Sequence, residues 1–303
     1  MKLIVNDKDL SSLYSAITWS GDKKQRSRSI SVSYACPIGT DLPQIEVHNG
    51  DTVALQDDSG KQRFIGIVTE VSSSLSDIKV DFTGRDILWY LGKNKVSGTF
   101  SGTPEEITRN VLSLFSISPG TFPVPAITEV KTVISTGDKT IHGVISEAYG
   151  DGYYIFADGE KVSVAAEGSE IVAVISGEGN LLDATYSASI EAMVNRVLIV
   201  DDKGTVVQQV QDDANLSFGL MQETYKMEKD KDPSTEARKL LHGEDTDSEI
   251  ECIGDWNCIA GKAVYVMDTS NGMLGKFVIT DDKHTFSGGI HRMTLGVEVE
   301  AMK

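Results

Sequence analysis

Apolar and polar side chains alternate over several short stretches in the first hundred residues. The stretch from Ile30 to Tyr34 carries its apolar residues at every second position, and residues 51–55 and 78–82 do the same. This period of two is typical of a β-strand with one buried face. Residues 63–71 resume the pattern after the turn residues 57–60. Short strands at this spacing predict a small barrel or sandwich.

A different pattern follows and predicts a small α/β module. Thr103 is the expected N-cap of a helix, Pro104 suits its first turn, and Glu106 stands at the capping-box position. The sequence 118–120 ends this helix. A second helix is expected over 138–149, followed by a β-hairpin of strands 153–156 and 161–164. The apolar stripe of the first helix consists of Ile107, Val111, Leu114 and Phe115.

Strand patterns return near residue 189. Residues 195–200 and 205–210 read as two strands joined by a turn. The charged run 226–232 is expected to be a solvated loop, and a short helix from Pro233 to His242 follows it. Residues 245–248 are expected to form a second loop.

Two stretches that lie 211 residues apart read as copies of one β-unit. Residues 50–83 align with residues 261–294 without a gap, and the strand–turn–strand pattern agrees along the alignment. We therefore expect the same fold in both stretches. Gly50 and Gly261 are expected to mark equivalent bends with positive φ, where glycine is favoured, and to respond alike to substitution. The identical pairs are Gly50/Gly261, Val53/Val264, Asp57/Asp268, Ser59/Ser270, Thr69/Thr280, Ser76/Ser287 and Thr83/Thr294.

These patterns together predict a mainly β protein with an α/β insertion. Its expected parts are two similar small β-barrels and a helix-hairpin module. We place the first barrel in residues 1–100, the helix and α/β module in 101–184, and the second barrel in 185–303. The second barrel is expected to carry a short helical insertion around 226–246.

The chain of 303 residues is strongly acidic, with a net charge of −17. Nucleic-acid binding needs clustered Lys and Arg, so a stable complex with nucleic acid is not expected. The first nine residues lack the apolar run of a signal peptide, and no segment approaches the ~20 apolar residues of a membrane span. With three cysteines, an odd number, the chain is expected to fold in a reducing host cytoplasm and not to insert into a membrane.

A search for reactive motifs predicts no catalytic, cofactor-binding or metal-binding residue and no cofactor. Residues 245–249 begin like a calcium loop, but Ile250 stands where such a loop needs glycine. His284 and His291 have no third ligand in sight and are expected to be solvated surface histidines. The spacing of Cys252 and Cys258 is not that of a zinc site. Cys36 is expected to be a buried inert thiol, Asp57 and Asp268 turn residues, and Trp19, Trp89 and Trp256 core residues.

The repeat and several short sequence segments resemble the baseplate hub protein of contractile-tailed phages. The closest resemblance is to the hub of PBSX-like prophages and phage-tail-like bacteriocins, and it spans essentially the whole chain. The segments that carry it are 18–22, 50–53, 64–68, 189–197, 236–241 and 259–266.

The resemblance implies a structural role as a homotrimer. With two similar barrels per chain, a trimer presents six barrels and adapts a six-fold tail tube to a three-fold spike. The implied partners are the chain itself, the tail tube or a tube-proximal baseplate protein, and the spike, with tape-measure and wedge proteins as further candidates. The chain would be made in the host cytoplasm and assembled into the baseplate of a virion or tail-like particle.

Two other functions stay open on the sequence alone. A tail-associated cell-wall hydrolase would need a catalytic group, and none can be assigned. A carbohydrate-binding module is the second alternative, because small β-barrels often bind sugars through tryptophans, and the chain has three.

Overall fold

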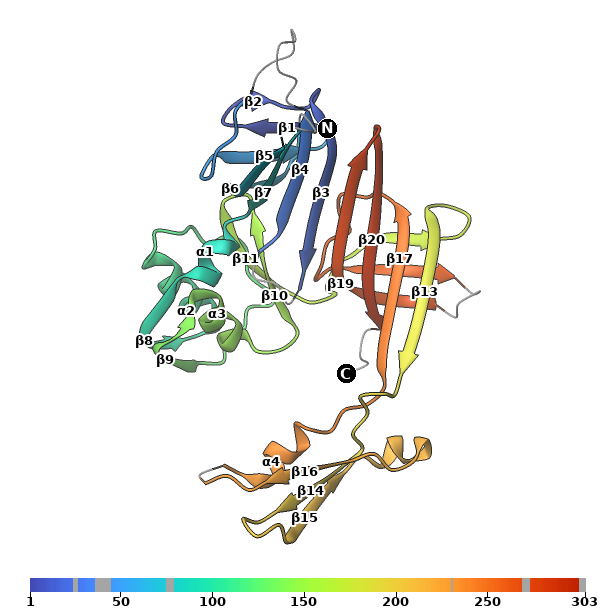
Figure 1. Cartoon of the computed structure of the whole chain (residues 1–303). Helices are drawn as coiled ribbons and strands as arrows, with labels where there is room; N and C mark the ends of the chain where they lie inside the picture. Colours follow the sequence, from blue (N-terminus) through green and yellow to red (C-terminus); the bar gives the residue numbers. More distant parts are fainter. Residues whose placement is uncertain (24–26, 36–44, 75–78, 230, 269–272, 300–303) are drawn as a thin grey trace. The chain divides into compact units, whose positions relative to one another are not determined.

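The structure is a computed structural model that describes all residues except 24–26, 36–44, 75–78, 230, 269–272 and 300–303 (Figure 1). Its contacts form two compact units. One comprises Met1–Ala184 and Glu249–Lys303, and the other comprises Thr185–Ser248. The prediction of a mainly β protein is confirmed. The division into 1–100, 101–184 and 185–303 stays a prediction.

The N-terminal strands form what we call the first sheet module. Its strands follow one another across the sheet in the order β1, β5, β6, β7, β4, β3, and neighbouring strands are antiparallel. Alternate residues of these strands, among them Leu3, Val53 and Ile30, are fully buried in one core. The bounds are β1 (Lys2–Val5), β3 (Tyr14–Asp22), β4 (Ser29–Ala35), β5 (Thr52–Gln56), β6 (Gln62–Ser74) and β7 (Lys79–Arg85), with β2 (Lys8–Asp9) beside β1.

A second sheet module has the same layout and a core of its own. Its strand order is β12, β18, β19, β20, β17, β13. The module differs from the first in one orientation, because β12 runs parallel to β18 whereas β1 runs antiparallel to β5. Its core includes Ile250, Val266 and Leu295. The bounds are β12 (Ile171–Ser176), β13 (Leu181–Ser189), β17 (Asp245–Ile253), β18 (Ala263–Asp268), β19 (Met273–Ser287) and β20 (Ile290–Val299).

The hydrogen-bond registers of the two modules agree in detail. Val53 faces Gly66 in the first module, and Val264 faces Phe277 at the same place in the second. A β-bulge interrupts β6 between Val68 and Glu70, and the equivalent bulge interrupts β19 between Ile279 and Asp281. Since a bulge bends its strand and strengthens the local twist, both modules curl at the same position. The predicted equivalence of the two segments is therefore confirmed as far as β6 and β19.

The ungapped alignment is wrong at the last strand. Glu70 pairs with Thr83 in the first module, whereas Asp281 pairs with Gly296, not with Thr294, in the second. The β19–β20 hairpin is thus two residues longer than the β6–β7 hairpin. The identity of Thr83 and Thr294 does not reflect equivalent positions.

The described strands of both modules belong to one thirteen-stranded curled sheet. The link is the antiparallel pairing of β3 with β19. The sequence predicts two separate barrels, but here the modules share a sheet. No sequence pattern specified the pairing of strands this far apart along the chain.

The two equivalent glycines have the positive φ that the sequence predicts. Gly50 has φ +92° and Gly261 has φ +90°. Each donates its backbone N–H across the sheet, Gly50 to Val68 and Gly261 to Ile279. Their surroundings differ, because a Cβ on Gly261 would lie 2.4 Å from the ring of Tyr154, while a Cβ on Gly50 would meet nothing within 4 Å. Because these surroundings differ, we expect the two glycines to respond differently to substitution, and not alike as the sequence suggested.

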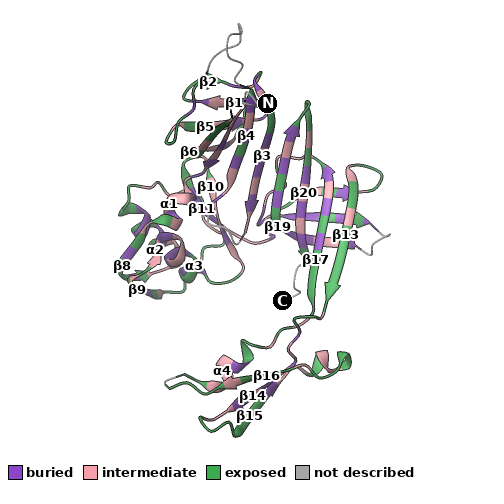
Figure 2. Cartoon of the chain, viewed as in Figure 1, coloured by how far each residue is buried: buried purple, intermediate pink, exposed green. Residues whose placement is uncertain are grey.

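A smaller α/β module with a third core lies between the two sheet modules in sequence. Thr103 and Glu106 form the predicted capping box of its helix α2. This helix ends at Ser113, earlier than predicted, and α3 starts only at Ile141 because β9 extends to Thr140. Buried residues of α2 and α3, purple in Figure 2, share one core with residues of β8, β9 and β11. The bounds are α1 (Leu88–Lys93), β8 (Lys95–Gly102), α2 (Pro104–Ser113), β9 (Lys131–Thr140), α3 (Ile141–Tyr149), β10 (Tyr153–Asp158) and β11 (Lys161–Ala166).

The second unit has a small core of its own. Strand β14 lies between antiparallel β15 and parallel β16, and Ala237 of α4 packs against Val197 and Ile199 of β14. The predicted strand pair and the predicted short helix are confirmed, although the helix ends at Arg238. The bounds are β14 (Arg196–Val200), β15 (Val206–Gln211), the 3₁₀-helix η1 (Asp213–Phe218), β16 (Gln222–Lys226) and α4 (Pro233–Arg238).

Candidate functional site at the strand junction

The candidate functional site is the junction where the first sheet module joins the second. Edge strand β3 pairs antiparallel with the part of β19 that follows the bulge. Asp22 faces Asp281 at one end of the junction, and Ile17 faces Phe286 at the other. The earlier part of β19 pairs with β18 instead. The long, bulged strand β19 therefore pairs on this side with two strands in turn, β18 of its own module and β3 of the first module.

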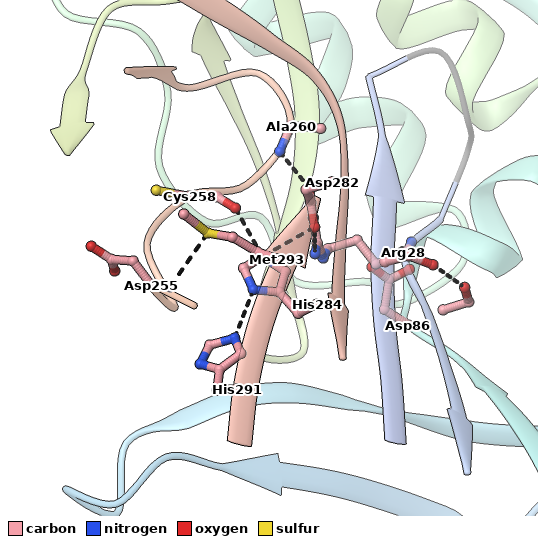
Figure 3. Close-up of polar contacts among 11 residues, drawn as sticks. Arg28, Asp86, Asp255, Cys258, Ala260, Asp282, His284, His291 and Met293 are labelled. Carbon is pink, nitrogen blue, oxygen red and sulfur yellow. Dashed lines mark hydrogen bonds and ion pairs between the residues drawn. The ribbon is translucent and has the colours of Figure 1, made fainter. Parts of the chain in front are cut away.

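A buried ion pair lies across this junction (Figure 3). Arg28, just before β4, donates from both terminal guanidinium nitrogens to the two carboxylate oxygens of Asp282 on β19. The Asp282 side chain is fully buried, and that of Arg28 is 13% exposed. The backbone N–H of Ala260 also donates to Asp282, at 2.6 Å. Such a bidentate pair specifies geometry strongly, and breaking one partner leaves an uncompensated buried charge.

Histidines continue the network. His284 lies between the carbonyl oxygen of Cys258, at 2.9 Å from Nε2, and His291, whose Nε2 is 3.0 Å from Nδ1 of His284. Because a carbonyl only accepts, Nε2 of His284 carries the proton, and Nδ1 of a neutral His284 accepts from His291. Burial lowers the pKa of His284, and burial together with His284 lowers the pKa of His291 to about 4.

Aromatic rings surround these polar groups. The centroid of Trp19 lies 4.9 Å from that of His284 and 5.7 Å from that of Trp256. The guanidinium of Arg28 stands 4.1 Å from the centroid of Trp19, a cation–π distance. The junction is thus closed by a packed aromatic cluster as well as by strand hydrogen bonds.

A second buried carboxylate braces Arg28 from the other side. Asp86 accepts hydrogen bonds from the backbone N–H groups of Arg28, at 3.1 Å, and of Leu88, at 3.0 Å. Burial raises the pKa of Asp86 to about 7. The backbone at the start of β4 is thereby held next to the turn that follows β7.

The structure corrects two predictions about possible metal ligands. His284 is fully buried, so the prediction of solvated surface histidines is wrong. The expected loop at 245–248 is also wrong, because β17 begins at Asp245 and extends through this segment. Among the described residues, no group of three or more His, Cys, Asp or Glu is placed to hold a metal ion.

The remaining predicted residues fall in structural positions. Cys252 and Cys258 are buried, and burial raises the pKa of the Cys252 thiol to about 12 and that of Cys258 further. Asp57 accepts hydrogen bonds from Ser59 and Lys61 in its turn. Asp268, Trp19 and Trp256 pack at or near cores, and the half-buried ring of Trp89 meets that of Tyr90 edge-on. Cys36 lies outside the described residues.

Sequence reasoning missed Arg28, Asp86 and Asp282. The bulge at Thr280 shifts the alternation of β19 by one residue, so Asp282 and His284 face inward. The alternation of apolar and polar residues does not reveal a buried charge in a polar stretch. It becomes readable only when the position of the bulge is known. The pairing partner of Asp282 lies 254 residues away along the chain.

No helix among the described residues is long and apolar enough to cross a membrane.

Comparisons with known proteins show where this fold occurs. The 43 kDa tail protein of prophage MuSo2 from Shewanella oneidensis aligns over 98% of this chain and 96% of its own, with a TM-score of 0.76 at 15% identity. The E. coli c3393 protein covers 99% of this chain and 78% of its own, with a TM-score of 0.58 at 11% identity. That protein is described as a type VI secretion component structurally similar to T4 tail proteins gp27 and gp5. The fold is that of phage tail proteins and their relatives.

The sequence places the chain within this class. The YqbQ-like family model matches residues 17–298. The phage-like element PBSX protein XkdQ of Bacillus subtilis (strain 168) is 26% identical over 302 residues, covering 93% of this chain and 91% of that protein. The chain belongs to the YqbQ-like family of PBSX-like phage tail proteins. The resemblance to PBSX-like prophage proteins that is read from the sequence is confirmed.

Proposed function

We propose that the chain is the baseplate hub of a contractile phage tail or tail-like bacteriocin. In this proposal three copies close a ring that joins the six-fold tail tube to the three-fold spike. The observation that carries the proposal is the repetition of one six-stranded layout within the chain, in the orders β1-β5-β6-β7-β4-β3 and β12-β18-β19-β20-β17-β13. Three copies then present six similar modules, each closing like a small barrel against its neighbours.

The junction geometry supports a ring. The two modules are joined head to tail, because an edge strand of one meets the bulged strand of the other. A head-to-tail contact that is repeated generates a closed ring when its rotation closes and a filament when it does not. A rotation of about 60° per module, as six modules per turn require, gives a closed trimer.

The expected partners follow from the two faces of such a ring. One face would meet the tail tube or a tube-proximal baseplate protein, and the other the spike, with tape-measure and wedge proteins as further neighbours. The chain carries a net charge of −17, so a trimer carries three times that value, or −51. An acidic ring repels nucleic acid and would not retain it in transit.

The role that we propose needs no catalysis. The candidate nucleophile nearest the histidine pair is Cys258, whose burial raises its pKa and keeps the thiol protonated. His284 is fully buried and held between Cys258 and His291. These groups serve the fold of the junction.

The test places the chain within an intact particle. Particles carrying an epitope-tagged copy should bind the matching antibody at one end of the tail tube, with three labels per particle at saturation. Loss of the gene should yield tubes that lack a spike, and the wild-type gene supplied in trans should restore it. Labels spread along the tube, or spikes that attach normally without the chain, would contradict the hub role.

A further inference from the structure

Each sheet module contains both halves of the junction, but among the described strands the junction forms only once. The edge strand of the first module, β3, pairs with the post-bulge part of β19 in the second. The edge strand of the second module is β13, which ends the strand order of the sheet. The post-bulge part of β6, Glu70–Ser74, pairs with β7 on one side and has no described strand on the other. One edge strand and one docking strand are therefore left over.

The equivalence of β3 and β13 can be set residue by residue. The N–H of Ala35 donates to the carbonyl of Leu13 at 3.2 Å, and the N–H of Ile253 donates to the carbonyl of Asn180 at 2.9 Å. Ala35 ends β4 and Ile253 ends β17, so these bonds occupy the same place in the two modules. Both edge strands then begin at the next residue and span nine residues.

The sequences of the two edge strands agree in this alignment. Thr18-Trp19-Ser20-Gly21 falls on Thr185-Tyr186-Ser187-Ala188, with two identities, an aromatic pair and a small-residue pair. This similarity played no part in setting the alignment. The hydrogen bonds set the start of each strand. Beyond the bulge of β3, the same spacing of three residues brings Tyr14 and Ile17 to the first core and Leu181 and Ala184 to the second.

We propose that β13 of one copy pairs antiparallel with Glu70–Ser74 of β6 in the next copy, in the register of the β3–β19 junction. Asp22 faces Asp281 and Trp19 faces His284 within the chain. The equivalent contacts between copies place Ser189 opposite Glu70, Ser187 opposite Ser72 and Tyr186 opposite Ser73. The partner of each unpaired strand edge is thus a second copy of this chain.

Side-chain exposure fits this assignment. Trp19 is only 2% exposed at the junction within the chain, whereas its counterpart Tyr186 is 55% exposed. Leu182, on the same edge strand, is 50% exposed. An exposed edge strand that carries large apolar side chains is a template for pairing with another chain. Pairing with β6 would cover Tyr186 as pairing with β19 covers Trp19.

The junction between copies would lack the buried ion pair. The positions equivalent to Asp282 and Arg28 are Val71 and Thr246. Removing two charges from water is costly, and two chains that meet after folding avoid this cost when the facing residues are uncharged. The junction within the chain, between β3 and β19, which we call the inner junction, is specified by charge. The proposed junction between copies is specified by strand hydrogen bonds and apolar contact.

The number of copies in the assembly rests on the proposed function, but the strand pairing does not. With six modules per turn, three copies close a ring and satisfy every open strand. Another rotation angle would give a different ring or a filament with the same strand contact.

Disulfide trapping tests the register. Ser72 and Ser187 are exposed, and the proposed pairing places them directly opposite each other across two copies. Opposed residues of antiparallel strands have Cβ atoms about 4.5–5.5 Å apart, within reach of a disulfide. The double variant Ser72→Cys/Ser187→Cys, oxidised as the full chain, should form linked dimers and trimers that a reductant dissolves.

The matched control is Ser73→Cys/Ser187→Cys. It moves one cysteine by a single residue, which places it on the opposite face of the sheet. The control should link no more than the wild type, whose own three cysteines set the background. Circular dichroism should show that both variants keep the wild-type fold.

The outcomes separate this inference from the proposed function. Because oxidation accumulates even transient pairs, absence of linked species from Ser72→Cys/Ser187→Cys overturns the strand pairing. Equal linking of the control overturns it too. If native mass spectrometry shows a trimer but the cysteines of Ser72→Cys/Ser187→Cys do not link, the hub ring stands and this strand contact is refuted. If linking produces a series of multimers larger than the trimer, the strand contact stands and the ring of three is refuted.

Discussion

Asp282 is the residue on which the inner junction depends most directly. It accepts from both arms of Arg28 and from the backbone of Ala260, and its carboxylate lies 3.5 Å from Nε2 of His284. The contacts with Arg28 and Ala260 join β19 to segments that precede it in the chain. Loss of the charge would leave the Arg28 guanidinium buried without its anion.

We therefore expect Asp282→Asn to lower the free energy of unfolding by about 3 kcal/mol, the scale for breaking a buried ion pair. Urea unfolding followed by tryptophan fluorescence measures it, because Trp19 and Trp256 lie at the junction. Asp281→Asn, at the exposed neighbouring position, is the control. Equal losses for both variants would show that the ion pair contributes little. The double variant Arg28→Met/Asp282→Leu should recover part of the loss.

The two equivalent glycines should differ in their response to alanine. Both have positive φ, so each Ala variant carries about 1–2 kcal/mol of backbone strain. Only Gly261→Ala also pushes a methyl group into the ring of Tyr154. We expect a clearly larger loss of stability for Gly261→Ala than for Gly50→Ala in thermal melts.

A double-mutant cycle identifies the cause of that difference. In the background of Tyr154→Ala, Gly261→Ala should cost no more than Gly50→Ala costs in the same background. A difference that survives the removal of Tyr154 would rule out the ring contact as its source.

The histidine pair should make the junction sensitive to acid. The pKa of His291 is about 4 in the folded chain, below its ordinary value of 6.5, so the folded state binds this proton less readily. The stability that depends on neutral His291 is complete above pH 6.5 and is lost as the pH falls toward 4. His291→Gln keeps a donor for His284 and removes the titration.

The free energy of unfolding should therefore fall less steeply between pH 6.5 and 4 in His291→Gln than in the wild type. His48→Gln, at an exposed histidine, is the matched control and should follow the wild type. Parallel curves for all three proteins would contradict a role for His291 in acid sensitivity.

At the scale of elements, strands with clear alternation were predictable and their pairing was not. Period-two patterns located β4, β5 and β6, and the cap residues located the start of α2. The two extra residues of the β19–β20 hairpin escaped the sequence alignment, because a shift of two keeps every side chain on its own face. A shift of that size leaves the apolar pattern unchanged, so only backbone hydrogen bonds reveal it.

The capping box of α2 gives the element-scale prediction. The Thr103 side chain accepts from the N–H of Glu106, and the Glu106 carboxylate accepts from the N–H of Thr103. Thr103→Ala removes one half of this exchange and should destabilise the α/β module by about 1 kcal/mol. Hydrogen exchange of the α2 amides measures it locally. Thr103→Ser, which keeps the hydroxyl, should retain the wild-type protection, and loss of protection in both would implicate the methyl group instead.

At the scale of the whole molecule, the duplication was visible in the sequence because glycine and turn residues recur at fixed spacing. The junction was not, since β3 and β19 are far apart in the chain and their contact depends on an unpredicted bulge. Thr185–Ser248, which runs from the end of β13 to the start of β17, forms a unit with its own core. Its separate core explains how the second module can be interrupted without loss of its strand order.

Native mass spectrometry of the full chain decides whether three copies close one ring. One chain has a mass of 32.8 kDa. We expect a species of three times that mass that grows with concentration and is not followed by larger multiples. A chain that stays monomeric at the highest concentration reached, or that forms a series of ever larger multiples, would contradict the closed trimer.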